Sequence, residues 1–153
     1  MKKILIALDY DPSAQKVAEK GFILAQSMNA EVILLHVICD PSCSALFEHV
    51  TIVGFANHET PDVPIKSSDE TLIEKSLLFL EKYKQHLKDK DIQLMVKEGD
   101  VADEILKIAK SLKIDLIIMG SQSHRQLEKV IVGSSTEKVL SMTSIPLLII
   151  PTK

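Results

Sequence analysis

Short apolar segments alternate with amphipathic segments along most of the chain. The apolar segments are rich in Ile, Leu and Val, as is typical of strands buried on both faces of a parallel sheet. We predict such strands at residues 3–8, 31–37, 92–96, 114–119 and 145–150.

Apolar residues recur at helical spacing between these strands. Ser13 can cap a helix over residues 14–28, and Ser68 or Asp69 can cap the next. The stripes predicted to be buried on the second and third helices are Ile73, Leu77, Leu80 and Leu87, followed by Ile105, Ile108, Ala109 and Leu112. A fourth helix opens at Gly133 and runs to about Met142.

Alternating strands and helices predict an α/β fold. We expect one domain over residues 1–153, a doubly wound five-stranded parallel sheet with helices on both faces. Residues 38–68 interrupt the pattern with prolines, serines and a glycine, and we interpret them as an irregular insert. Within it, residues 50–53 could form a short element of their own.

Candidate chemistry gathers after the fourth strand. Ligands of doubly wound sheets bind at the carboxyl ends of the strands, where the winding reverses. If the first and fourth strands are neighbours, that crevice lies between Asp9 and Gly120. Gly133, Ser134 and Ser135 then open a helix whose N–H groups would attract an anion, most naturally phosphate. Alternatively, Gly120 only makes a turn and one of the serines only caps the helix.

The spacing Gly120-x2-Ser123-x9-Gly133-Ser134, with Asp9 closing the first strand and His36-Val37 the second, resembles the universal stress protein family. Nucleotide-binding members carry Gly-x2-Gly-x9-Gly followed by Ser or Thr, so Ser123 replaces the second glycine. If that glycine needs positive φ, serine costs about 1 kcal/mol and adds a side chain near the ligand. Its hydroxyl could instead donate to a phosphate oxygen.

The resemblance implies a Rossmann-like, adenine nucleotide alpha hydrolase-like fold that binds ATP or another adenine nucleotide. It implies that Asp9 and Leu8 serve the adenosine end, Val37 the adenine, Met119 and Gly120 the ribose, and Gly133, Ser134 and Ser135 the phosphates, with Ser123 at the altered position. Asp9 and Asp11 could hold Mg²⁺ with the nucleotide. No catalytic residue is identified, since a nucleophile elbow and a Walker lysine are both missing. The alternatives are a slow ATP hydrolase and a stress protein that binds no nucleotide.

A metal site is the rival interpretation. His36, Cys39, Cys43, His49 and His58 are zinc-ligand types within a short span, but structural zinc more often uses Cys-x2-Cys pairs. We therefore predict no resident metal. Arg125 and Lys129, beside the phosphate-side glycines, are interpreted as solvated loop cations.

Charge and composition exclude other classes. The net charge of −3 and the spread of lysines along the chain argue against nucleic-acid binding. No apolar run reaches the ~20 residues of a membrane span, and two cysteines suit a reducing compartment, so we expect a cytoplasmic protein. With 4% aromatic residues, adenine would rest on aliphatic side chains.

The last predicted strand, from Ile145 to Ile150, is uniformly apolar. At a sheet edge, such a strand invites pairing with another chain. The resemblance implies the same, since family members commonly dimerise through this strand, and we expect a homodimer. Alternatively, the insert covers this strand.

Overall fold

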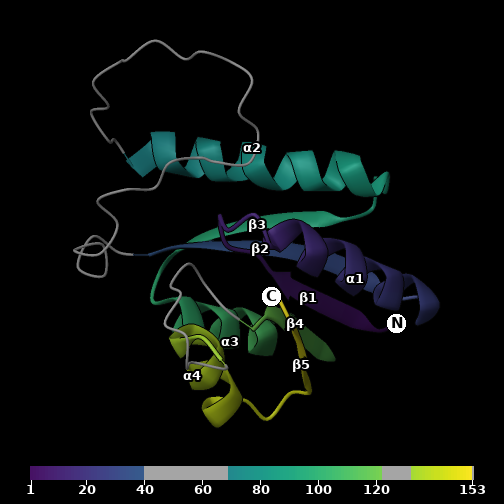
Figure 1. The fold of residues 1–153 in the computed structure, drawn as a ribbon, viewed down its shortest axis with the longest axis vertical. Coiled ribbons are helices and arrows are strands. Elements are labelled where there is room, and N and C mark those ends of the chain that lie inside the picture. The colour runs from purple at the N-terminus through teal and green to yellow at the C-terminus, as the bar shows by residue number, and fades with distance from the viewer. Residues whose placement is uncertain (40–68, 122–131, 153) are drawn as a thin grey trace.

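The predicted strands form one parallel sheet in the order β3-β2-β1-β4-β5 (Figure 1). The structure, a computed structural model, describes residues 1–39, 69–121 and 132–152. Its strands are β1 (Lys3–Ala7), β2 (Glu31–Cys39), β3 (Gln93–Gly99), β4 (Leu116–Gly120) and β5 (Leu147–Ile150). The predicted α/β fold with a five-stranded parallel sheet is confirmed.

Helices cover both faces of the sheet (Figure 1). The helices are α1 (Ala14–Ser27), α2 (Asp69–Leu87), α3 (Val101–Ser111) and α4 (Ser134–Met142). One core cluster joins the sheet to α1 and α2, and a second joins it to α3 and α4. Alternate residues of β1 divide between them: Ile4 and Ile6 belong to the first cluster and Leu5 to the second.

The winding of the sheet reverses between β1 and β4. These strands pair directly, with Ile4 opposite Leu116 and Ile6 opposite Ile118. The chain passes outward from β1 through β2 to β3, then returns through α3 to β4 on the other side of β1. The crevice predicted between Asp9 and Gly120 therefore lies at the topological switch point.

Each strand differs from its predicted bounds by one to three residues at one end or at both. The differences in β2 and β5 have a visible cause. β2 continues beyond Val37 because Ile38 and Cys39 still pair with Glu98 and Gly99 of β3. β5 begins at Leu147 instead of residue 145, because the N–H of Ile145 is taken by the Thr143 hydroxyl at 3.0 Å.

Two helix predictions also need correction. Ser13 occupies the cap position of α1 but makes no side-chain cap bond; its own N–H donates to Asp11 Oδ1 at 2.8 Å. Leu77 was expected in the buried stripe of α2, yet it is 40% exposed, whereas Leu80 is fully buried. Of the strands that the structure describes, β3 is the outermost on this side, so this part of the sheet does not extend beneath the outer flank of α2.

The described parts of the chain contain no candidate membrane-spanning helix. None of the helices there combines the length and apolar character that a bilayer span requires.

Candidate functional site

Two hydrogen bonds fix the start of α4 against the end of β4. The N–H of Gly133 donates to the carbonyl of Ser121 at 2.7 Å, and the hydroxyl of Thr136 donates to the carbonyl of Gly120 at 3.1 Å. Thr136 is 4% exposed, and this second contact is partly buried. The first turn of α4 is thereby held at the carboxyl edge of the sheet, beside the switch point.

The first turn of α4 offers backbone donors to an anion. Gly133 is the cap residue and has extended backbone angles, φ −67° and ψ 153°, and its own N–H is already used by Ser121. The N–H groups of Ser134 and Ser135 lie in the first helical turn, where no intrahelical carbonyl can accept from them. The alternative that a serine caps this helix is wrong, because the cap is Gly133 and makes no side-chain bond.

The aliphatic residues predicted for the nucleoside are buried at the ends of their strands. Val37 of β2 and Met119 of β4 are 8% and 6% exposed and belong to the core cluster on the α3 and α4 face. Leu8 belongs to the opposite cluster, with α1 and α2. Val37 and Met119 therefore lie on the same face of the sheet, whereas the side chain of Leu8 lies on the other face.

The loop after β1 is shaped by its two aspartates. The N–H of Asp11 donates to Asp9 Oδ1 at 3.2 Å, and the N–H of Ser13 donates to Asp11 Oδ1 at 2.8 Å. Such side-chain contacts to the N–H two residues on are typical of Asx turns. They fix both carboxylates at the carboxyl end of β1, across from Gly120.

A buried histidine, His36, supports this loop, and the sequence did not predict this role. His36 is 5% exposed, and its Nδ1 bonds the carbonyl oxygen of Leu8 at 2.8 Å. Its ring lies 4.3 Å from that of Tyr10 and 5.7 Å from that of Phe79, measured between centroids. Burial lowers the pKa of His36, although the bond to Leu8 partly opposes this. The ring is therefore neutral at pH 7, with the proton on Nδ1.

Tyr10 ties the same loop to α2. Its hydroxyl lies 2.6 Å from Oγ of Ser76, which is 1% exposed. Burial raises the pKa of Tyr10, while the hydrogen bond to Ser76 lowers it. A polar residue at position 76, inside an otherwise apolar helical stripe, was the signal that could have revealed this contact.

His36, one of the candidate zinc ligands, is buried in this cluster. The Nδ1 atom of His36 is engaged by Leu8, and its ring packs against Tyr10. Cys39 is half-buried at the end of β2. Nowhere in residues 1–39, 69–121 and 132–152 do three potential ligands gather. The remaining candidates, Cys43, His49 and His58, lie outside the described residues, as do residues 50–53, Ser123, Arg125 and Lys129.

Comparison with known proteins identifies the family to which this chain belongs. The model of the universal stress protein family matches residues 1–151. This chain belongs to the universal stress protein family. Universal stress protein MJ0577 of Methanocaldococcus jannaschii is 30% identical over 99% of this chain and 96% of its own. Stress response protein NhaX of Bacillus subtilis is 25% identical over 97% and 96%.

Solved structures place this family member in the same fold. A structure of protein MJ0577 superimposes with a TM-score of 0.73 at 28% identity, covering 99% of this chain and 96% of that one. A universal stress protein in complex with cAMP gives a TM-score of 0.67 at 16% identity, covering 99% and 98%. At that identity, the second likeness concerns the fold.

Proposed function

We propose that this universal stress protein is a nucleotide-responsive binding module of the stress response, which takes ATP or a related adenine nucleotide at the carboxyl edge of β1 and β4. One observation carries the proposal. The N–H groups of Ser134 and Ser135 are held at the switch point by the bonds that tie Gly133 and Thr136 to the end of β4. A helix N-terminus fixed there favours phosphate.

The rest of the crevice suits a nucleoside. Val37 and Met119 provide an aliphatic surface for a base, and the Asp9 carboxylate stands at the end of the neighbouring strand. Asp9 and Asp11 could also hold Mg²⁺ that accompanies the phosphates. A related protein of this fold is known in complex with cAMP, which supports an adenine nucleotide as the ligand class.

The first experiment separates binding from turnover. Purified protein is titrated with ATP, ADP and AMP in the presence of Mg²⁺ by calorimetry, and product is measured in the same samples. We expect saturable binding without turnover. Multiple turnovers would favour a slow ATP hydrolase, and no saturation at millimolar nucleotide would leave a stress protein without this ligand.

A single-donor variant tests the phosphate site. Ser134→Pro removes one N–H at the first helical position, where proline is tolerated, and the preceding Gly133 already has the extended backbone that proline requires. Losing one hydrogen bond to a charged group should weaken ATP binding about tenfold or more. The matched control is Val101→Pro, since Val101 opens α3 after the extended Asp100. The control should bind ATP as the parent does.

Ser123→Gly examines the altered motif position. Restoring the glycine removes a side chain near the ligand path and relaxes any need for positive φ. We expect tighter ATP binding. Unchanged affinity would show that position 123 does not limit binding.

We propose further that the protein works as a cytoplasmic homodimer through β5. Among the described residues, β5 pairs only with β4, and residues 145–150 carry no charge. Leu148 on this strand and Leu140 and Met142 on α4 are 37%, 53% and 56% exposed. An apolar edge strand with apolar neighbours favours pairing with a second copy.

Light scattering at micromolar concentration tests the dimer. Leu148→Lys should convert it to a monomer, because two lysines would then face each other across the paired edge. Ile23→Lys is the control, since Ile23 is 65% exposed on α1, away from β5. A monomeric parent protein would refute the dimer.

A further inference from the structure

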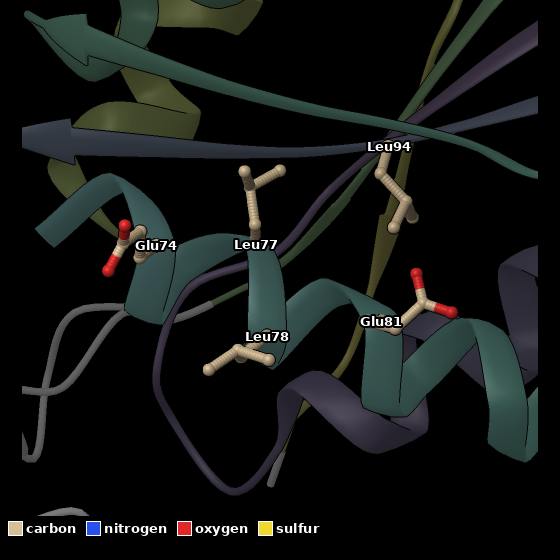
Figure 2. A pocket seen from close by; sticks show the side chains of 5 residues that line it. All are labelled: Glu74, Leu77, Leu78, Glu81 and Leu94. Atoms are coloured by element: carbon tan, nitrogen blue, oxygen red, sulfur yellow. The ribbon is translucent and has the colours of Figure 1, made fainter. Parts of the chain in front are cut away.

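An apolar hollow lies at the opposite edge of the sheet, between α2 and β3. It is lined by Glu74, Leu77, Leu78 and Glu81 of α2 and by Leu94 of β3 (Figure 2). Leu77 points toward the strands, and Leu94 points from β3 toward the helix. Leu77 and Leu78 are 40% and 64% exposed, although leucine gains from burial. Leu77, which the sequence predicts to be buried, is instead exposed in this hollow.

The strand beside this hollow has an open edge. Within the described part of the chain, β3 pairs with β2 alone, from Gln93 to Gly99. The outer edge of such a strand presents backbone N–H and C=O groups to a further strand. Extended segments of partner proteins use such edges: main-chain hydrogen bonds give affinity, and pockets for alternate side chains give specificity.

Carboxylates surround the leucines. Glu74 and Glu81 lie two helical turns apart on the row that includes Leu77 and Leu78. Glu98 shares the strand face of Leu94, because residues four apart on a strand point the same way. These three glutamates are here called the acidic rim.

The lysines of α2 leave the acidic rim largely uncompensated. Lys82 precedes His86 by one turn, and His86 bonds Glu19 of α1 at 2.7 Å, so this row faces α1. Lys75 lies on the same row, two turns before Lys82. Lys84 follows Leu77 by two helical turns, so it lies on the same row, just beyond Glu81.

We propose that this surface receives an extended segment of a partner protein, added as a strand to the outer edge of β3, whose face toward α2 carries both apolar and basic residues, one at every second position. Its apolar side chains would cover Leu77 and Leu94, and its lysines or arginines would meet Glu74, Glu81 and Glu98. The proposal does not depend on nucleotide binding.

Charge decides between the possible occupants. A second copy paired through β3 would bring two acidic rims together, which is unfavourable. Residues 40–68 of this chain carry four acidic residues and one lysine, so their charge does not complement the rim. A small molecule is disfavoured too, since the hollow of about 530 Å³ is lined by leucines and carboxylates without varied hydrogen-bonding groups.

The test uses a blocked nine-residue peptide in which Lys and Leu take turns at the odd positions and Thr fills the even positions, so that both kinds lie on one face of the extended peptide. A matched peptide has Glu in place of Lys. Binding is followed by fluorescence anisotropy, and amide exchange is followed by mass spectrometry. We expect saturable binding of the Lys peptide only, weakening as salt increases. Exchange should slow over β3, residues 93–99, and remain unchanged over β5.

Variants of the surface sharpen the test. Glu74→Gln with Glu81→Gln should weaken the Lys peptide about 2- to 30-fold, as expected for two exposed ion pairs. Leu77→Ser should weaken it further by removing apolar contact. Ile23→Ser is the control, because Ile23 is 65% exposed on α1, and this variant should bind as the parent does.

Several outcomes would overturn the proposal. Equal binding of both peptides, binding that Leu77→Ser leaves intact, or binding without protection of residues 93–99 would each do so. If β3 is already as protected as β2 in the protein alone, its edge is occupied by the chain itself. If that protection rises with protein concentration, the occupant is a second copy.

Discussion

The Nδ1 atom of His36 lies 2.8 Å from the carbonyl oxygen of Leu8, so the interior of β2 is bonded directly to the residue before Asp9. The contact requires a proton on Nδ1 and is buried. The ring also packs on Tyr10, which bonds Ser76 of α2. The loop that carries Asp9 is therefore fixed from two neighbouring elements.

Stability should depend on pH through His36. Its pKa is lowered in the folded protein by burial, whereas in the unfolded chain it lies near ~6.5. As pH falls through 6.5, the unfolded chain binds the proton first, so the free energy of unfolding decreases until the folded pKa is passed. Urea unfolding of the parent at a series of pH values from 8 to 5 should show this loss.

Replacement of His36 isolates this contribution. His36→Phe keeps an aromatic ring but cannot titrate, and it removes the donor to Leu8 at a cost of about 1 kcal/mol at pH 8. The difference in stability between parent and variant should shrink as pH falls toward 5. His86→Gln is the control, since His86 is exposed in its bond to Glu19. A constant difference between parent and His36→Phe would contradict the assignment.

Thr136 should matter through its hydroxyl. Thr136→Val preserves shape but leaves the carbonyl of Gly120 without its 3.1 Å donor, and we expect a loss of about 1–2 kcal/mol in unfolding free energy. Thr136→Ser keeps the hydroxyl and should lose less. A larger loss for Thr136→Ser than for Thr136→Val would show that the methyl group, not the hydrogen bond, is responsible.

Asp100 should stabilise α3 mainly as a cap. Its carboxylate accepts from the N–H of Asp103 at 3.0 Å, and this bond and the contact with Lys138 lower its pKa. Asp100→Ala should cost about 1 kcal/mol, while Asp100→Asn should retain most of the stability. Lys138→Met should cost less than Asp100→Ala, because the ion pair is exposed and screened. Thermal unfolding at two salt concentrations measures all three.

Gly99 should resist substitution because of its backbone. It has φ +137°, and an added Cβ would lie 3.3 Å from Cγ of Glu104. Gly99→Ala should cost about 1–3 kcal/mol of stability. Adding Glu104→Ala to that variant removes the contact but not the backbone strain. Full recovery in the double variant would assign the cost to crowding alone.

Much of the fold could be predicted because buried strands are nearly continuous in their apolar residues. In a segment such as 31–37, apolar residues point to both faces of the strand, so neither face can be exposed to solvent. This pattern predicts a parallel sheet covered by helices on both faces. The position of the crevice also followed once β1 and β4 proved adjacent. Strand order itself comes from tertiary packing, which periodicity does not encode.

Other features depended on contacts between distant residues. Leu77 fits a helical stripe as well as Leu80 does, but burial depends on how far the sheet extends beneath α2. The sequence indicates only that His36 lies near the end of a strand, because nothing in it shows that the ring donates a hydrogen bond to the carbonyl of Leu8. The candidate site residues Gly133, Ser134 and Ser135 were predicted from a local signal, a glycine and hydroxyl residues at a helix start.

The two edges of the sheet differ in charge, and this difference bears on how copies of the chain could assemble. Joining β5 of one copy to β3 of the next would be head-to-tail and could continue into an open filament. The uncharged β5 can face itself across a two-fold axis, whereas Glu74, Glu81 and Glu98 oppose a second β3. Assembly through the edges would thus terminate at two copies, with both β3 edges left outward for other proteins.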